Sequence, residues 1–440
     1  MKFSNYNLII WDDIGKQQIL FHTLSGNCFT LDDQTAQAIR QNRIDLMPQE
    51  EIKMLKEKNI IINDDTDESR YIEYFHNLSK FDTSHLSFTI LLTWACNLRC
   101  IYCYEGAGEL HDIALDADDC KAILAFMKKQ IICVRPRQVS FMLFGGEPLM
   151  NIKAAEQILT EMDRFCGEQE LVYQTGIITN GTLLSEEIVQ FLIKFHCNYI
   201  QITLDGIKGI HDKRRVSKDG SSSFDKIIHA LELLKAQSDC IKPVLRINVD
   251  KDNVNAIAAL LAELKRRNFT KLQLDFGIVH NGTKACFAYA DRCFREEELG
   301  ERLNTLWQMV RKYGFPISPR PFSKFLYCGL NREQAYTIAP NLDVYKCWEQ
   351  VGDEQHKIGT IRHDGAFTEN MKQLADWMSI NPTKIEACKK CAYLPVCGGG
   401  CAARAYERYG TYHAPGCFQV KGVIEKEILD YLRQKKMITS

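Results

Sequence analysis

Three closely spaced cysteines are the residues of this sequence whose spacing most clearly predicts chemistry. Cys96, Cys100 and Cys103 follow an apolar run in the order C-x3-C-x2-C. A [4Fe–4S] cluster usually takes four cysteine ligands, so a short loop that supplies three leaves one iron free to bind another molecule. Zinc is the alternative metal, but structural zinc needs four ligands, usually as two separated pairs. The spacing therefore predicts an iron–sulfur site with one reactive iron.

The same segment resembles the signature of the radical S-adenosylmethionine (SAM) superfamily. In that signature an aromatic residue precedes the third cysteine, and Tyr102 stands in this position. The resemblance implies that the open iron binds the amino and carboxylate groups of SAM. It also implies that one-electron cleavage of SAM yields a 5′-deoxyadenosyl radical, which removes a hydrogen atom from a substrate, so that the cofactor performs the difficult chemistry.

Composition narrows the class of protein. A chain of 440 residues exceeds what one hydrophobic core normally supports, which predicts two or three domains. With 55 basic and 56 acidic residues the net charge is −1, which predicts neither a nucleic-acid partner nor an anionic membrane surface. The sequence shows no signal peptide and no run of 18 apolar residues, so we expect a cytoplasmic protein. That compartment keeps thiols reduced, and its cysteine-rich proteins favour metal ligands over disulfides.

Residues 1–70 are predicted to form a small α+β unit. Short strand-like runs at 7–11, 18–22, 27–30 and 60–62 are combined with helical stretches from Asp32 or Asp33 to Ala38 and from 49 to 58. This order resembles the peptide-binding winged-helix module at the front of many peptide-modifying radical SAM enzymes. The alternative is a small cap that only covers the next domain. The acidic run 64–68 and residues 71–85 are predicted to be a solvated linker.

Residues 86–295 alternate apolar strand-like runs with amphipathic helical stretches, the pattern of a parallel sheet with helices outside. The predicted strands are 87–93, 139–144, 173–179, 198–204, 243–249 and 272–278, and the predicted helices are 115–132, 151–166, 185–196, 223–237 and 254–267. Six such units resemble the partial (β/α)6 barrel of the superfamily. By analogy with full barrels, reacting groups belong at the carboxyl ends of the strands.

The segments after the predicted strands carry the remaining signals for SAM. Gly145-Gly146-Glu147-Pro148 follows the second strand and matches the family's GGE motif, which implies that its backbone and Glu147 hold the methionine amino group. Paired glycines let a ligand approach the backbone closely. Further predicted SAM neighbours are Thr179, Asn180, Thr203 and Asp205 at later strand ends. The family usually has serine where Thr203 stands, and each segment could equally be an ordinary turn.

A basic segment follows the fourth predicted strand. In His211-Asp212-Lys213-Arg214-Arg215, the resemblance makes Arg215 a candidate for the SAM carboxylate, although His211 and Arg215 could instead orient the loop. Asp275 and Asn248 project from later strands and could equally be buried structural groups.

A second set of cysteines occupies residues 326–440, after a predicted helical bridge at 296–325. It comprises Cys328, Cys347, Cys388, Cys391, Cys397, Cys401 and Cys417. The layout resembles the seven-cysteine SPASM extension, which in relatives binds two auxiliary [4Fe–4S] clusters, although Leu342 stands where the family has glycine. The resemblance implies that Cys328, Cys347 and Cys401 hold the first auxiliary cluster. The four other cysteines, Cys388, Cys391, Cys397 and Cys417, would hold the second.

The first auxiliary cluster has three ligands from the motif. Either Cys286 or Cys293 supplies the fourth, or that iron is open to water or to a substrate thiolate. A zinc ribbon could explain four of the seven cysteines. The remaining cysteines lie singly in apolar surroundings, where free cysteine is commonly a small core residue.

The substrate class follows from the resemblance to SPASM enzymes, which mostly act on peptides or proteins. Sulfatase-maturing enzymes carry an aspartate after the cysteine that corresponds to Cys347, whereas this chain has Trp348 and then Glu349. The Cys-Trp-Glu-x-Val-Gly run, Tyr104-Glu105 and the N-terminal unit look more like maturases of ribosomally made peptides, which form thioether or carbon–carbon cross-links. Candidate general bases are Glu349, Asp205 and Asp275.

Together these features predict a radical SAM peptide maturase with SAM and three [4Fe–4S] clusters. Its expected partners are a precursor peptide and a low-potential electron donor of the flavodoxin or ferredoxin type. The alternatives are an anaerobic sulfatase-maturing enzyme, which oxidises cysteine or serine to formylglycine, and a non-catalytic iron–sulfur scaffold that binds a peptide. The glycine pair argues against the scaffold, because a scaffold needs no SAM site.

Overall fold

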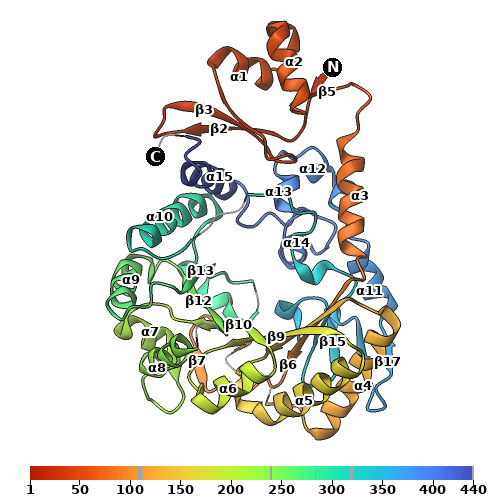
Figure 1. Cartoon of the computed structure of the whole chain (residues 1–440), viewed down its shortest axis with the longest axis vertical. Helices are drawn as coiled ribbons and strands as arrows, with labels where there is room; N and C mark the ends of the chain where they lie inside the picture. Colours follow the sequence, from red (N-terminus) through yellow and green to blue (C-terminus); the bar gives the residue numbers. More distant parts are fainter. Residues whose placement is uncertain (107–111, 238–239, 283, 318–320, 439–440) are drawn as a thin grey trace.

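The computed structural model describes residues 1–106, 112–237, 240–282, 284–317 and 321–438. A half-open barrel forms one end of the molecule, the N-terminal unit forms the other, and the C-terminal helices α12 to α15 lie between them (Figure 1). No helix in these described ranges is long and apolar enough to cross a membrane.

The barrel is built on six parallel strands, as the sequence predicts. They are β6 (His85–Leu91), β8 (Gln138–Phe144), β9 (Val172–Thr179), β10 (Cys197–Thr203), β12 (Lys242–Val249) and β13 (Gln273–Ile278). Their order across the sheet is β13-β12-β10-β9-β8-β6, and each pair is parallel. Their carboxyl ends therefore meet at one edge. The partial (β/α)6 fold is confirmed.

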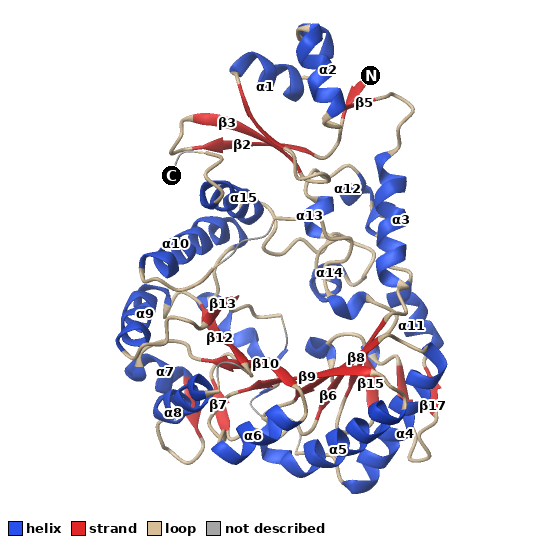
Figure 2. Cartoon of the chain, in the orientation of Figure 1, coloured by secondary structure: helices blue, strands red, loops and turns tan. Residues whose placement is uncertain are grey.

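Helices cover the outer face of this sheet (Figure 2). They are α4 (Ala117–Val134), α5 (Ile152–Glu168), α6 (Glu186–Lys194), α7 (Lys208–Arg214), α8 (Ser223–Ala236) and α9 (Ile257–Arg266). Side chains alternate along each strand: Val139, Phe141 and Leu143 of β8 are buried in the main core, whereas Ser140 and Met142 lie on the inner face and are half-buried. The apolar face of each strand thus supports the helices and leaves the inner face for polar groups.

The C-terminal region from residue 326, predicted to be a SPASM domain, extends the same sheet. Its strands are β14 (Ala335–Ile338), β15 (Asp343–Tyr345), β16 (Gly359–Ile361) and β17 (Phe367–Glu369). β14 pairs in parallel with β6, and the next three strands continue the sheet in antiparallel order. An open barrel leaves the β6 edge available, and a covering strand satisfies its backbone groups. These strands are too short to show a periodic pattern.

A helix stands where a solvated linker was expected. α3 spans Glu68–Lys80, and the carboxylate of Asp67 caps it by accepting a hydrogen bond from the Ser69 backbone. Its buried face carries Ile72, His76 and Lys80, spaced four residues apart. His76 Nδ1 bonds to the Phe325 carbonyl at 2.7 Å and Lys80 Nζ donates to the Ile380 carbonyl at 2.6 Å. The sequence did not predict this helix, because polar residues on its buried face interrupt the apolar periodicity.

The N-terminal unit is the predicted α+β assembly. Its elements are β1 (Lys2–Phe3), β2 (Asn7–Asp12), β3 (Gln17–His22), β4 (Cys28–Leu31), α1 (Asp33–Arg40), α2 (Gln49–Glu57) and β5 (Ile61–Ile62). β2, β3 and β4 form an antiparallel sheet with two apolar faces. One face packs on α1 and α2 through Leu20 and its neighbours. The other face, with Ile10 and Phe21, packs on Ile428 and the rest of α15 (Val423–Gln434).

The remaining helices and strands include α12 and α13, which carry Cys388 and Cys397 of the second set. These helices and strands are β7 (Leu98–Cys100), β11 (Arg215–Ser217), α10 (Leu299–Lys312), α11 (Met371–Met378), α12 (Glu386–Lys389), α13 (Leu394–Cys397) and α14 (Ala402–Tyr409). Cys397 belongs to the same apolar cluster as the N-terminal sheet and α15. The N-terminal unit is therefore seated directly on the cysteine-rich region.

Ile428→Ala tests this seating. Ile428 is fully buried between the sheet and α15, so its truncation should lower the free energy of unfolding by about 2–5 kcal/mol. Anaerobic guanidinium unfolding, followed by far-ultraviolet circular dichroism, measures the change. The exposed Lys53→Ala on α2 should stay within about 0.5 kcal/mol. Equal midpoints for both variants would contradict the packing described above.

Candidate functional site

The three cysteines of the C-x3-C-x2-C motif lie on the loop that leaves the carboxyl end of β6. The segment after β8 holds this loop through two backbone hydrogen bonds. Gly146 N–H donates to the Thr93 carbonyl and Glu147 N–H donates to the Ala95 carbonyl, both at 2.9 Å. A Cβ on Gly145 would lie 2.3 Å from the Thr93 oxygen, and a Cβ on Gly146 would lie 2.3 Å from the Trp94 oxygen. The two glycines therefore leave room for the backbone of the cysteine loop as well as for a ligand.

Glu147 is fully buried between β8 and β9. Its carboxylate accepts hydrogen bonds from the Thr179 hydroxyl at 2.7 Å, the Asn180 backbone at 2.7 Å and the Leu149 backbone at 3.0 Å. Burial raises the pKa of Glu147, and these three donors oppose the rise. The carboxylate thus ties two strand ends together, and Pro148 begins the turn that follows it. Contact of Glu147 with the SAM amino group stays a prediction.

Asn180 connects the end of β9 with the cysteine loop. Its Nδ2 lies 3.8 Å from Cys96 Sγ and donates to Asn97 Oδ1 at 2.8 Å. Thr203 is buried at the end of β10, the neighbouring strand. The structure thus brings Asn180 against the first cysteine and places Thr203 at the same edge of the sheet.

Tyr102 joins the loop to the ends of β10 and β12. Its hydroxyl donates to Asp205 Oδ2 and accepts hydrogen bonds from Arg215 Nη1 at 2.9 Å and Asn248 Nδ2 at 3.1 Å. Burial raises the pKa of Tyr102 well above its usual value, although the charge of Arg215 lowers it and that of Asp205 raises it further. Tyr102 therefore stays protonated and anchors the loop.

A buried ion network that the sequence reading missed completes this anchor. Arg214 contacts Asp205 at 3.5 Å and Asp250 at 2.8 Å, and all three side chains are almost wholly buried. Tyr289 donates to Asp250 Oδ2 at 2.7 Å. The Arg-Arg pair at the end of α7 was the available signal, but only the fold shows that both side chains turn inward. Asp205 is thus engaged by Tyr102 and Arg214.

Arg215 offers a test of whether this site fits a charged cofactor. The side chain is 8% exposed, and within the described part of the chain its buried Nε has no hydrogen-bond acceptor. Burial would lower the pKa of Arg215, but the neighbouring Cys100, Tyr102 and Asp205 raise it well above the usual value. An unused guanidinium nitrogen beside cluster-type cysteines fits a carboxylate ligand. The residues present therefore fit SAM held on a cluster.

The second set of cysteines gathers in the two groups that the resemblance implies. The pKa of Cys347 is raised well above its usual value by burial, by the charge of Glu349, and by the nearby Cys401 and Cys328. Burial raises the pKa of Cys388 to about 12, and Cys417, Cys397 and Cys391 add to the rise. Bound metal would reverse these shifts, because it requires thiolates. Their role as ligands stays a prediction.

Left-handed turns shape both groups. Gly398, Gly399 and Gly400 all have positive φ between Cys397 and Cys401, which lets the chain turn sharply between two cysteines of different groups. Leu342 also has a positive φ, of 67°. The turn for which relatives use glycine is therefore kept, at a cost of about 1–2 kcal/mol. Burial of the leucine side chain in the main core offsets that cost.

Cys286 and Cys293 are the two candidates for the fourth ligand of the first auxiliary group, and that role stays a prediction. Cys286 and Cys293 lie in an apolar cluster with Val279 and Tyr289, against Tyr102. Within the described residues, no group of three or more His, Cys, Asp and Glu side chains is close enough to hold a single metal ion. A cubane does not require such a group, because each cysteine binds a different iron.

The three candidate bases are all engaged by arginine. Asp205 contacts Arg214, and Asp275 pairs with Arg246 on the inner face of β12 and β13. Glu349 accepts from Arg404 Nη2 at 2.9 Å. Burial would raise the pKa of Glu349, but His280 and Arg404 outweigh it and lower the pKa. A carboxylate held as an ion pair is a weak base, so none of the three is favoured by its surroundings.

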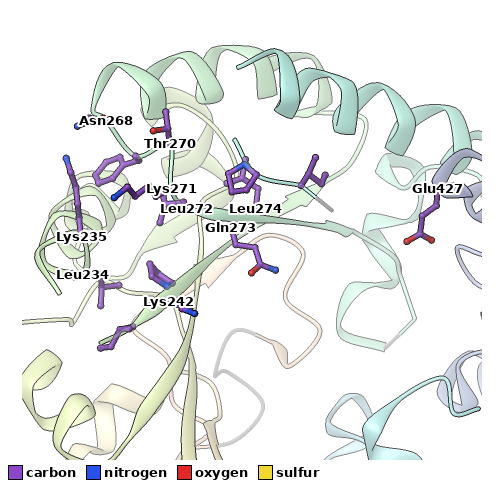
Figure 3. Close-up of a pocket in the computed structure, with 15 residues that line it drawn as sticks. Leu234, Lys235, Lys242, Asn268, Thr270, Lys271, Leu272, Gln273, Leu274 and Glu427 are labelled. Carbon is purple, nitrogen blue, oxygen red and sulfur yellow. The ribbon is translucent and has the colours of Figure 1, made fainter. Parts of the chain in front are cut away.

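Two of the cavities lie at opposite ends of β13. A large one of about 1000 Å³ lies at the amino ends of β12 and β13, where Lys235, Lys242 and Lys271 gather and Glu427 of α15 faces them across the opening (Figure 3). It is at the opposite end of the strands from the cysteine loop. A smaller cavity of about 350 Å³ lies at the carboxyl end of β13, lined by His280 and Arg404. The smaller cavity is the one beside the predicted chemistry.

The family comparison agrees with this geometry. Residues 90–267 match the model of the radical SAM superfamily. The chain carries a radical SAM domain. A domain of this kind implies SAM and one [4Fe–4S] cluster, for which Cys96, Cys100 and Cys103 are the predicted ligands.

Several curated proteins are similar over most of this chain. The Fe-coproporphyrin III synthase of Methanosarcina barkeri is 25% identical, over 75% of this chain and 87% of that protein. A cysteine-type anaerobic sulfatase-maturating enzyme of Clostridium novyi is 26% identical, over 76% and 92%. The mycofactocin maturase MftC of Mycolicibacterium smegmatis is 26% identical, over 72% and 77%.

Two solved structures share the fold. The structure of anSMEcpe with bound AdoMet and the Cp18Cys peptide has a TM-score of 0.59 at 19% identity, over 80% of this chain and 98% of that chain. The structure of Streptococcus suis SuiB bound to the precursor peptide SuiA has a TM-score of 0.53 at 16% identity, over 96% and 100%. The similarity to SuiB extends over nearly the whole of this chain.

Gly146→Ala tests the seat of the cysteine loop. The added methyl would meet the Trp94 and Ala95 carbonyls at 2.3 and 2.5 Å, and backbone cannot move aside. We expect the variant to lose most of the iron of the first site after anaerobic reconstitution, measured by iron analysis and visible absorption. The matched control is Gly167→Ala within α5, where nothing lies within 4 Å and the change favours the helix. Full iron in both variants would contradict the proposed seat.

Proposed function

We propose that the chain is a radical SAM maturase that cross-links side chains of a ribosomally made precursor peptide, most simply as a thioether. The observation that carries this proposal is the set of three cysteines Cys328, Cys347 and Cys401. Cys286 and Cys293, the two further candidates for a fourth ligand, pack beside Tyr102, and we propose that neither binds the cluster held by these three. One iron of a cluster held there would be open to a substrate thiolate.

The N-terminal unit supports a peptide substrate. In the described sheet β4 pairs only with β3, so its outer edge can receive an extended peptide as a further strand. The same sheet packs against the region of Cys397, which brings a peptide held there toward the cysteine-rich half of the molecule. The likeness to SuiB, whose structure holds a precursor peptide, includes this part of the chain because it covers 96% of it.

Similarity to sulfatase-maturating enzymes favours the sulfatase-maturing alternative, whereas the residue after Cys347 argues against it. Trp348 stands where the resemblance expects an aspartate, and its ring packs on Phe144 with the centroids 5.8 Å apart. It belongs to an apolar cluster with Leu91 and Trp94. This position therefore supplies packing and no base. Glu349 is next to it, but it is held by Arg404 and His280.

The chain's own residues have distinct tasks in this proposal. SAM on a [4Fe–4S] cluster held by Cys96, Cys100 and Cys103 would supply the hydrogen-abstracting radical. Arg215 would bind the SAM carboxylate through its free nitrogen, and Gly145 and Gly146 would set the loop. Two further clusters would be held by the two groups of the second cysteine set, and a low-potential donor would deliver the electron.

SAM cleavage is the first expected outcome. Anaerobically reconstituted protein with SAM and a strong reductant should release 5′-deoxyadenosine, quantified by liquid chromatography, whereas Cys100→Ala should release none. With a short cysteine-bearing peptide encoded beside the gene, the peptide should lose the mass of two hydrogens. Protein that loads iron yet never cleaves SAM would instead be a peptide-binding scaffold. Conversion of a sulfatase-derived peptide to an aldehyde would reverse the choice of substrate.

The first auxiliary cysteine group is tested separately. Cys347→Ala should still cleave SAM but yield no cross-linked peptide, and it should lose about four of roughly twelve irons per chain. Iron analysis and peptide mass spectrometry measure both effects. The exposed Cys133→Ala should leave iron and product unchanged. Cross-linking at the normal rate by Cys347→Ala would exclude a role for this group in catalysis.

A further inference from the structure

Lys346 is a buried lysine directly beside a predicted cluster ligand. It follows β15 and precedes Cys347, and it is 2% exposed. Its Nζ donates to three carbonyl oxygens, those of Arg332 at 2.6 Å, Glu333 at 3.1 Å and Ala335 at 2.6 Å. Because consecutive residues are one peptide unit apart, the ammonium lies within about the length of one lysine side chain from the Cys347 backbone. It also ties the chain that enters β14 to the residue before this cysteine.

The hydrogen bonds of Lys346 favour its charged form. An ammonium has three hydrogens, which match the three carbonyls, whereas a neutral amine would turn a lone pair toward one of them. The ring of Tyr336, whose centroid is 5.6 Å from Nζ, also favours a cation. Burial lowers the pKa of Lys346 to about 7, an effect that the charge of Glu333 opposes and that of Lys80 increases. The geometry thus holds a positive charge where burial alone disfavours it.

A second buried lysine approaches Cys347 from α3. Lys80, the last residue of that helix, is 2% exposed, and its Nζ donates to the Ile380 carbonyl at 2.6 Å. Ile380 packs in the same apolar cluster as Cys347. The Glu333 backbone donates to the Lys80 carbonyl at 2.9 Å, which joins the surroundings of the two lysines. Two positive charges are therefore buried near one cysteine of the first auxiliary group.

Carboxylates do not balance these two charges. In the part of the chain that the structure describes, both ammonium groups donate to carbonyls and neither forms an ion pair with a carboxylate. Glu333 is exposed and accepts from Gln334 at 3.2 Å, and Glu349 is paired with Arg404. A buried charge is costly unless an opposite charge lies near it. Thiolates of a [4Fe–4S] cluster at Cys347 would supply the negative charge that these side chains do not.

We propose that Lys346 and Lys80 are the counter-charges of the first auxiliary cluster, and that they make this cluster an electron acceptor by stabilising its reduced form. The inference rests on the proposed function, because it requires a cluster at Cys328, Cys347 and Cys401. In the proposed cross-link the hydrogen atom leaves in 5′-deoxyadenosine and the thiol loses its proton to water. The carbon radical and the thiolate then form a C–S bond, and one electron is left over for an acceptor. A cluster gains negative charge when it takes up an electron, so nearby positive charges raise its reduction potential.

Lys346→Met tests the proposal, because it removes the ammonium and keeps an unbranched side chain. The matched control is Lys357→Met, between β15 and β16 of the same sheet. The Lys357 ammonium is more exposed and is ion-paired with Asp343 at 3.4 Å and Glu354 at 2.5 Å. Each anaerobically reconstituted protein is titrated with dithionite while electron paramagnetic resonance records the reduced clusters. The signal of the first auxiliary cluster is the one that Cys347→Ala lacks.

At a fixed solution potential, the ratio of reduced to oxidised first auxiliary cluster should fall at least about threefold in Lys346→Met. Lys80→Met should lower this ratio in the same direction, whereas Lys357→Met should leave it unchanged. Lys346→Arg keeps the positive charge and should stay within about twofold of the wild type. An equal ratio in Lys346→Met and the wild type, or an equal fall in Lys357→Met, would overturn the proposal.

If Lys346→Met fails to load the first auxiliary cluster, Lys80→Met decides by the same measurement. A lower ratio supports the proposal, and an unchanged ratio overturns it. A wild type with only about four irons per chain would also overturn it, because no auxiliary cluster would be present. A wild type that holds all three clusters but never cross-links a peptide would refute the proposed function, while the redox titration still decides the role of the two lysines.

Discussion

The burial of Asp205, Arg214 and Asp250 at the open end of the barrel is the constraint on which the rest of the site depends. These side chains are almost wholly buried, and a buried charge is tolerated only when its partners satisfy it. Here the partners come from different segments: Tyr102 from the cysteine loop, Asn248 from β12, and Tyr289 from the segment after β13. No one segment can satisfy the network alone, so the strand ends, α7 and the cysteine loop must assemble together.

The same network explains how a loop with little regular structure can hold three cysteines in place. β7 has only three residues, and its partner β11 begins at Arg215, directly after Arg214. The ion network fixes α7, α7 fixes β11, and β11 fixes the strand that ends at Cys100. The glycine pair after β8 supports the loop from the opposite side. The loop that would bind a cluster is therefore held both by β11 and by the segment after β8.

Most of the barrel could be predicted from the sequence, because six apolar runs alternate with amphipathic helices and each run is long enough to show its period. The predicted strand ends lie within two residues of those in the structure, for example 139–144 against Gln138–Phe144. α3 was missed because His76 and Lys80 occupy its buried face and satisfy backbone carbonyls there. β14 to β17 were missed because strands of three or four residues carry no periodic signal.

For the site, the cysteines and Tyr102 could be found from spacing, whereas the tasks of Asp205, Glu147 and Arg214 depend on contacts between segments far apart in the chain. A carboxylate next to a turn gives the same sequence pattern whether its side chain contacts a substrate or an arginine.

The arrangement of the two ends of the molecule gives the two groups in the second set of cysteines different surroundings. The group containing Cys347 lies close to the barrel mouth: Glu349 and the cavity lined by His280 and Arg404 adjoin it, and the charge of Cys347 acts on Tyr104 of the cysteine loop. The group containing Cys388 lies farther out, where Cys388 packs with Tyr6 and Cys397 packs with the N-terminal sheet. In the proposed function only the first group would leave an iron open to a substrate thiolate, since the second has four cysteines of its own. The N-terminal unit packs on the second group through Tyr6 and Ile10. In the proposed function, peptide capture by the N-terminal unit and chemistry at the barrel mouth would be separated in space, with α15 and α3 between them (Figure 1).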